Sequence, residues 1–183
     1  NYEHGAASFL SRIQFRDVKN IDGSISNEDF NQIIEASKIH KPKVSTIVIE
    51  NTHLASGGSI VPYENIKSIS DIAKKNDIKL HIDGARVWHA ILVEDKGYDY
   101  GTYTDSLTFC FSKALGAPIG SILLGSHEFI ENSREYRKKL GGGMRQAGVI
   151  ASAARYAIEN REHILIDHKN TKYIYEKLKE REE

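Results

Sequence analysis

The stretch KLHIDGAR at residues 79–86 decides how this chain is expected to fold. Its first five residues predict a strand that ends at Asp83, and Arg86 follows in the turn. Side chains alternate along a strand, so His81 and Asp83 share one face. Burying a carboxylate there is unfavourable unless it meets a cation or a hydrogen-bond donor. The stretch therefore indicates either a ligand site at a sheet edge or a cap for a helix starting near Ala85, with Arg86 in a surface ion pair.

The segments around this strand alternate between strand-like and helix-like patterns. Apolar or β-branched runs predict strands at 14–18, 44–49, 106–111 and 119–124, and helical patterns begin after 26, at 62, at 127 and at 147. The nearly continuous run at 44–49 is typical of a strand buried on both faces. The link from 111 to 119 is too short for a helical crossover, so 119–124 is expected to be antiparallel. Together these patterns predict an α/β fold, a mostly parallel sheet with helices on both faces and one antiparallel strand.

Composition places the chain among ordinary globular proteins. Its 183 residues suit one domain, and its 25 basic residues balance 25 acidic ones, so no net charge favours nucleic acid or a membrane surface. No apolar run approaches the roughly 20 residues that span a bilayer. Cys110 is the single cysteine, which excludes an internal disulfide and favours a reducing compartment, by default the cytoplasm. Because Asn1 is not a methionine and the last residues continue a helical pattern, we expect a fragment of a longer protein.

Polar residues gather where the predicted strands end, at 50–59, 83–86 and 112–118, and ligands bind at that edge of parallel sheets. Lys113 lies there in a loop of small residues. A partly desolvated amine stays neutral and can form a Schiff base with an aldehyde. Asp83 could hold a protonated pyridine nitrogen, and such a cationic ring accepts electrons from a carbanion. The plainer alternative for Lys113 is a solvated surface lysine.

Two further features leave alternatives open. In the segment RKKLGGGMRQ at 137–146, basic residues flank three glycines, which could present amides and charge to a phosphate. Taken alone, however, the segment favours a flexible connection between helices with solvated lysines. His81 is either a partner of Asp83 or a core histidine satisfied by another group.

Four blocks resemble, in order and spacing, the signature blocks of the low-specificity L-threonine aldolases: ENTH at 50–53, HIDGAR at 81–86, SKALGAPIGS at 112–121 and LGGGMRQAG at 140–148. The similarity runs from residue 2 to the final helix. It implies membership of the beta-eliminating lyase family and the large domain of a pyridoxal 5'-phosphate (PLP) enzyme of fold type I, the aspartate aminotransferase type. Residues 1–183 would be the central part of that domain, with the N-terminal segment and the C-terminal small domain outside this chain.

The resemblance also implies how the chain binds PLP. Lys113 would bond covalently to the cofactor, and Asp83 would pair with its pyridine nitrogen. Arg86 would contact the phenolic oxygen or the substrate carboxylate through its planar guanidinium. His81 would support Asp83 from the same strand face. Arg145 would reach the phosphate bound in a neighbouring subunit.

The remaining site residues implied by the resemblance act on the substrate. His53 would lie near the substrate hydroxyl as a base or as part of a water relay, and Glu3 close to the same chemistry. Lys138 would reach the active site of a neighbouring subunit. A homodimer or homotetramer with shared active sites is therefore expected, with an amino acid as the small-molecule substrate and no metal.

The reaction implied by the resemblance is cleavage of L-threonine or L-allo-threonine to glycine and acetaldehyde. Two alternatives stay open at this point. A different PLP-dependent amino-acid lyase, for example a β-eliminating one, would use the same Lys113 and Asp83. A truncated module that folds without turning over substrate would also fit. An ordinary nucleotide-binding protein is disfavoured, because the sequence has no P-loop or dinucleotide fingerprint.

Overall fold

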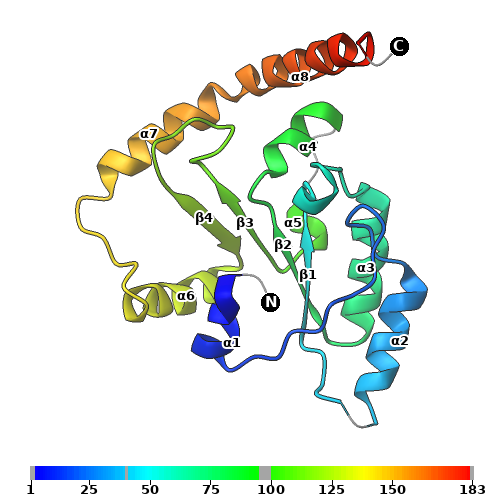
Figure 1. Cartoon of the computed structure of the whole chain (residues 1–183). Coiled ribbons are helices and arrows are strands. Elements are labelled where there is room, and N and C mark those ends of the chain that lie inside the picture. Colours follow the sequence, from blue (N-terminus) through cyan, green and yellow to red (C-terminus); the bar gives the residue numbers. More distant parts are fainter. Residues whose placement is uncertain (1–2, 40, 95–99, 182–183) are drawn as a thin grey trace.

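A computed structural model describes residues 3–39, 41–94 and 100–181 of the chain. Strands and helices alternate along it, as the sequence predicts for an α/β protein (Figure 1). The elements in chain order are η1 (Glu3–Gly5), α1 (Ala6–Ser11), α2 (Asn27–Ser37), β1 (Thr46–Glu50), η2 (Leu54–Ser56), α3 (Tyr63–Lys75), β2 (Lys79–Asp83), α4 (Val87–Glu94), α5 (Tyr100–Tyr103), β3 (Ser106–Cys110), β4 (Ser121–Gly125), α6 (His127–Lys139), α7 (Gly148–Glu159), η3 (Arg161–His163) and α8 (Ile164–Lys179).

The four strands form one sheet in the order β1-β2-β3-β4. β1, β2 and β3 are parallel, and β4 returns antiparallel along β3, which confirms the prediction made from the short link before it. Glu50 is in register with Asp83, and Asp83 with Thr108. The carboxyl ends of the three parallel strands therefore meet at one edge of the sheet.

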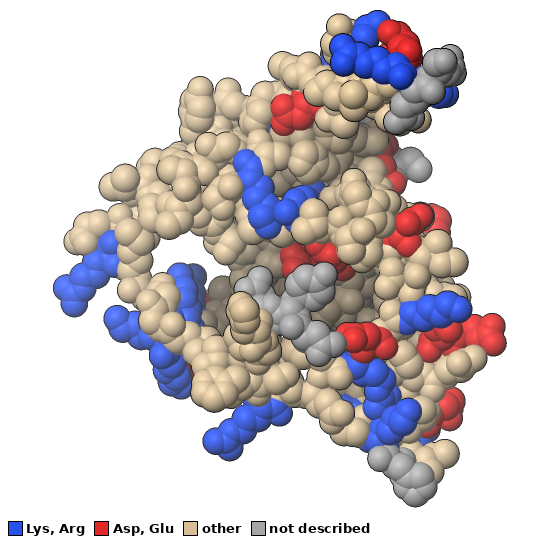
Figure 2. Space-filling model, viewed as in Figure 1, with Lys and Arg blue, Asp and Glu red and all other residues tan. Residues whose placement is uncertain are grey.

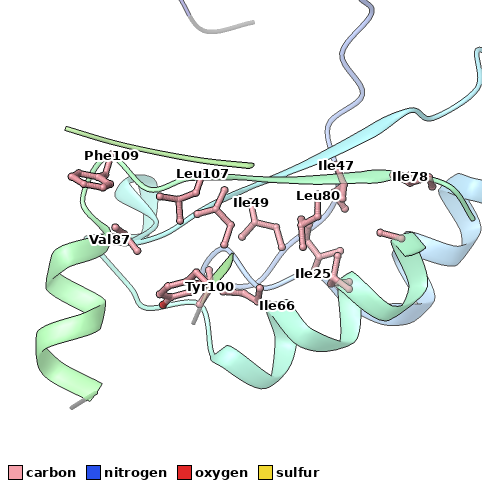
Figure 3. Close-up of a cluster of buried hydrophobic side chains, with 14 of the residues drawn as sticks. Ile25, Ile47, Ile49, Ile66, Ile78, Leu80, Val87, Tyr100, Leu107 and Phe109 are labelled. Carbon is pink, nitrogen blue, oxygen red and sulfur yellow. The ribbon is translucent and has the colours of Figure 1, made fainter. Parts of the chain in front are cut away.

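One face of the sheet packs on α3 and forms the core (Figure 3). α3 presents Ile66, Ile69 and Ala73 on a single face, as a helix of period 3.6 does when apolar residues recur at three- and four-residue spacing. Ile66 and Ile69 are completely buried. Burying each such side chain contributes about 1.5–3 kcal/mol. Alternate residues of the parallel strands reach the same core: Ile47, Ile49, Leu80, Ile82, Leu107 and Phe109.

The opposite face of β1 is largely open, which contradicts the prediction of a strand buried on both faces. Exposed and buried residues alternate along β1, and Val48 on the open face is 51% exposed. The reason is that the neighbouring side chains Ile47 and Ile49 face the core formed with α3, whereas Val48 points the other way. A continuous apolar run does not by itself distinguish these two environments.

The strand predicted at 14–18 is absent, because residues 12–20 form no helix or ladder. Ile13 and Phe15 in this segment are about half exposed. A run of five residues that includes Arg16 and Asp17 has too little apolar surface to anchor a strand without a ladder partner. Arg16 instead donates to the carbonyl oxygen of Ile33 in α2, at 3.3 Å.

The predicted helix starts agree with the structure. Ser26 caps α2, its Oγ accepting from the backbone N–H of Asp29 at 3.0 Å. Pro62 precedes the first residue of α3, and α7 begins one residue after the predicted position. In the described residues no helix combines the length and apolar character needed to cross a bilayer.

Candidate active site

The loops after β1, β2 and β3 begin side by side at the carboxyl edge of the sheet. The Asn51 N–H donates to the carbonyl oxygen of Asp83 at 2.9 Å, and the Gly84 N–H donates to that of Thr108 at 2.8 Å. These bonds continue the parallel ladder one step beyond the strands. Consequently, Asp83 at the end of β2 and the loops that carry His53 and Lys113 lie along one edge of the sheet, as the sequence predicts.

The Asp83 side chain is exposed at this edge. Its Oδ1 accepts from the backbone N–H of Ala85 at 3.1 Å, within the turn before α4. Because α4 begins at Val87, the predicted cap for a helix starting near Ala85 is not what the structure shows. Among the described residues the second oxygen has no hydrogen-bond partner, which leaves it able to accept from a ligand N–H. Arg86 is half-buried and, within the described part of the chain, forms no ion pair. The surface ion pair considered for Arg86 is therefore not what the structure shows.

His81 lies on the open face of β2 and is half-buried. Its Nδ1 is 2.8 Å from Ser106 Oγ on β3, so its hydrogen bond goes to Ser106. Burial lowers the pKa of His81, and the nearby Asp83 carboxylate opposes that effect. The hydrogen bond thus agrees with the alternative of a histidine satisfied by another group. The Asp83 carboxylate still acts on the charge of His81 through its electric field.

Lys113 lies in the loop after β3, and its side chain is exposed. The loop is held by Leu115 and Ala117, which are buried, and by two backbone bonds. The Gly116 N–H donates to Lys113 O at 2.8 Å, and the Ala117 N–H donates to Phe111 O at 3.0 Å. The desolvation expected for the amine is not seen, because small neighbours leave it open to solvent.

His53 follows β1, and one of its ring nitrogens is held within its own loop. Its Nδ1 is 2.8 Å from Ser56 Oγ, and the Ser56 hydroxyl donates to the carbonyl oxygen of His53 at 3.2 Å. Nδ1 is thus engaged with Ser56, and among the described residues Nε2 has no hydrogen-bond partner. Nε2 is therefore the ring nitrogen that is open to a ligand. The sequence did not indicate Ser56, a small polar residue without a recognisable motif.

Lys138 and Arg145 are exposed at the end of α6 and in the link to α7. Figure 2 shows basic side chains gathered on this part of the molecule, and in Figure 1 the link stands away from the sheet on the left. Within the described residues no contact joins either side chain to Asp83 or Lys113. Glu3 begins η1, and its side chain lies outside the described part of the chain.

His163 is a neighbour of the Lys113 loop that the sequence did not indicate. Its Nε2 lies 2.7 Å from the carbonyl oxygen of Ala114, across 49 residues of chain. No local pattern signals a bond of this separation to a backbone carbonyl. Only the fold reveals it.

The residues at the sheet edge suit PLP in their chemistry. An exposed amine at Lys113 could bond to the cofactor aldehyde, and the available oxygen of Asp83 could accept from a protonated pyridine nitrogen. Arg86 could supply a planar donor for a phenolate or carboxylate oxygen. An amine and a carboxylate at the carboxyl edge of a mostly parallel sheet are two groups that a PLP-dependent α/β enzyme needs.

The chain belongs to the beta-eliminating lyase family, which it matches over residues 1–182. It is 42% identical over 187 residues to low-specificity L-threonine aldolase 1 of Arabidopsis thaliana, covering 97% of this chain and 51% of that protein. It is 38% identical over 161 residues to an alanine racemase of Cochliobolus carbonum, covering 86% and 41%.

The solved structure of Leishmania major threonine aldolase supports the fold. It aligns with a TM-score of 0.74 at 18% identity, over 91% of this chain and 48% of that one. The chain thus spans about half the length of the curated aldolase it matches.

Proposed function

We propose that the protein containing this chain cleaves L-threonine or L-allo-threonine to glycine and acetaldehyde, with PLP as cofactor. The observation that carries the proposal is the shared edge of β1, β2 and β3, where the loops bearing His53, Asp83 and Lys113 begin. Family membership and the identity to a threonine aldolase support the choice of reaction. When bound, PLP supplies a cationic ring that accepts the electron pair released as the Cα–Cβ bond breaks.

The residues of this chain have distinct roles in the proposed reaction. Lys113 holds the cofactor through its amine, and the free oxygen of Asp83 keeps a proton on the pyridine nitrogen. Arg86 orients a carboxylate or phenolate oxygen, and His81 bears on the charge of Asp83 from the same strand face. His53 takes the β-hydroxyl proton at Nε2, the nitrogen that is not engaged by the contact between Nδ1 and Ser56 Oγ.

The proposed enzyme is a cytoplasmic homo-oligomer in which Lys138 and Arg145 act on a neighbouring subunit's site. Their exposure away from the sheet edge supports this assignment, because no described contact brings them to Lys113 in the same chain. Glu3 is proposed to lie near the same substrate. The chain itself is proposed to be the central part of the PLP-binding large domain. Cys110 is a free thiol, which supports a reducing compartment.

The test is to add PLP, reduce with borohydride and map the labelled peptide. Lys113→Ala should lose the reducible adduct and lower aldehyde release from L-threonine by about three orders of magnitude or more. Lys67→Ala, which removes an exposed lysine of α3, should change neither. Persistence of the adduct on another lysine would show that Lys113 is not the attachment point.

A second candidate reaction comes from the relatedness to an alanine racemase, a protein named for a reaction that breaks no carbon–carbon bond. The two are separated by product. Acetaldehyde and glycine formed from L-threonine support the aldolase. Racemised alanine formed from L-alanine would favour a racemase, and a keto acid formed from L-threonine without acetaldehyde would favour a β-eliminating lyase. An adduct at Lys113 with no product of either kind would indicate a cofactor-binding module without turnover.

A further inference from the structure

The loop that carries Lys113 is tied to the start of α8 through the side chain of His163. The His163 Nε2 lies 2.7 Å from the carbonyl oxygen of Ala114, the residue after Lys113. The other ring nitrogen, Nδ1, lies 2.8 Å from the carbonyl oxygen of Asn160, the residue that ends α7. The imidazole therefore bridges two backbone carbonyl groups that belong to different parts of the fold.

Both partners of His163 can only accept hydrogen bonds, and this defines the protonation state of the ring. A carbonyl oxygen has no proton to donate, so each ring nitrogen must carry one. A neutral imidazole has one N–H, whereas an imidazolium has two. The bonds to Asn160 and Ala114 raise the pKa of His163, desolvation opposes them, and the Asp167 carboxylate adds to them. The two contacts are satisfied together only in the protonated ring.

The His163 end of this link is anchored by a buried neighbour, and the loop end is anchored at Leu115 while Lys113 stays exposed. Ile164, next to His163, is completely buried at the start of α8. On the other side, Lys113 is exposed, and the backbone bonds of Gly116 and Ala117 close the loop only onto itself and the end of β3. The Ala114 carbonyl is therefore a point at which a distant, anchored element restrains the Lys113 segment.

We propose that the imidazolium of His163 is a positioning group for Lys113, which it restrains through the Ala114 carbonyl and releases when its proton is lost. The ring acts through the backbone and does not contact reacting atoms. After deprotonation the exposed ring keeps one N–H and can bond only one of the two carbonyl oxygens, so the bridge between Asn160 and Ala114 is broken. The consequence for catalysis rests on the proposed function, whereas the hydrogen-bonded link does not.

Several charged residues lie close to His163 along the chain or in the restrained loop. They are Lys113 in the loop, Glu159 at the end of α7, Arg161 and Glu162 in η3, and Asp167 in the first turn of α8. Arg161 is engaged elsewhere, because its guanidinium lies 5.5 Å from the Trp88 ring centroid and donates to Ile158 O at 2.9 Å.

The sign of the pH dependence follows from the raised pKa of His163. The link is complete below 6.5, the ordinary histidine value, and it is lost as the pH rises through the higher value in the folded protein.

Amide hydrogen exchange at Gly116 and Ala117, divided by the intrinsic chemical rate at each pH, tests the proposal. In the wild-type protein, protection should fall roughly 3- to 10-fold across the titration of His163, followed by NMR on its ring protons. His163→Ala should show the low value at every pH. His163→Arg, a permanent cation with several donors, should keep protection without the pH-dependent fall. His127→Ala, which removes an exposed histidine at the start of α6, is the matched control and should behave as wild type.

Equal protection in the wild type and His163→Ala at every pH would overturn the proposal, as would a fall in protection at a pH unrelated to the His163 titration. A poorly folded variant would show lost amide protection in the buried α3. In that case the proposal is still tested in the wild type, by comparing the pH at which protection falls with the pH at which His163 titrates. The outcome is independent of the enzymatic assignment. If hydrogen exchange behaves as proposed but no PLP adduct forms at Lys113, the proposed function is refuted and the His163 link is not.

Discussion

At Gly84 the fold requires a residue without a side chain because of close approach and not because of an unusual turn. A Cβ on Gly84 would lie 2.7 Å from the carbonyl oxygen of Thr108 and 3.1 Å from Val87 Cβ. Its φ is outside the left-handed region, so another residue could adopt the backbone conformation. The crowding arises because the Gly84 N–H donates to the same Thr108 oxygen, which brings the turn after Asp83 against β3.

Replacing Gly84 with alanine should destabilise the protein by about 1–3 kcal/mol, because the new methyl group meets backbone that cannot move aside. Chemical denaturation at equilibrium measures the change. Gly148→Ala is the matched control. No atom lies within 4 Å of a Cβ at this first position of α7, and alanine there should be neutral or slightly stabilising. Equal stability of the two variants would contradict the close approach at Gly84.

At the scale of elements, α4 and α8 meet through a pair of histidines. His89 Nδ1 lies 2.8 Å from His168 Nε2, and the ring centroids are 5.0 Å apart. One ring must donate and the other accept, so the bond is lost when both rings are protonated. Burial lowers the pKa of His89, and the charges of His168 and Arg86 add to this, while Asp167 opposes it.

This pair predicts a loss of stability in acid. A histidine whose pKa is lowered by folding binds fewer protons in the folded state, so its contribution is fully present above 6.5 and declines as the pH falls below that value. The free energy of unfolding should therefore drop less in His89→Asn than in the wild type between pH 7.5 and pH 5, roughly the interval in which histidines titrate. Asparagine can donate or accept in place of the ring without titrating.

His127→Asn, at an exposed site, should retain the wild-type slope. A His89→Asn variant with the full acid-dependent loss would place the origin of that loss elsewhere. The expected sign is opposite to that for His163, whose raised pKa favours the folded state at low pH. The two histidines can thus be distinguished by the direction of their effects.

The sequence predicted those elements whose signals are local. β2 has the predicted bounds, and β4 was recognised as antiparallel because the link before it is short. The strand at 14–18 failed because five residues without a ladder partner do not form a strand. The site divides in the same way. Asp83 and Lys113 follow from their places at strand ends, whereas the bond from His163 to Ala114 depends on packing between segments 49 residues apart.

On the scale of the whole molecule, the basic residues at the end of α6 and in the α6–α7 link lie apart from the sheet edge (Figures 1 and 2). Arg145 is exposed there, while the amine and carboxylate of the candidate site lie at the ends of β2 and β3. If Arg145 serves PLP, the proposed arrangement places it in the site of a second copy. Two different inactive variants can then compensate for one another.

Mixing Lys113→Ala with Arg145→Ala subunits, by co-expression or by joint refolding, tests this arrangement. In a mixed dimer with shared sites, one site combines the intact Lys113 of one chain with the intact Arg145 of the other. Random pairing of equal amounts should therefore restore about a quarter of the wild-type sites. If Arg145 served its own chain, each mixed dimer would hold two defective sites and recover no activity. Full activity of Arg145→Ala alone would remove this residue from the site altogether, whichever chain it belongs to.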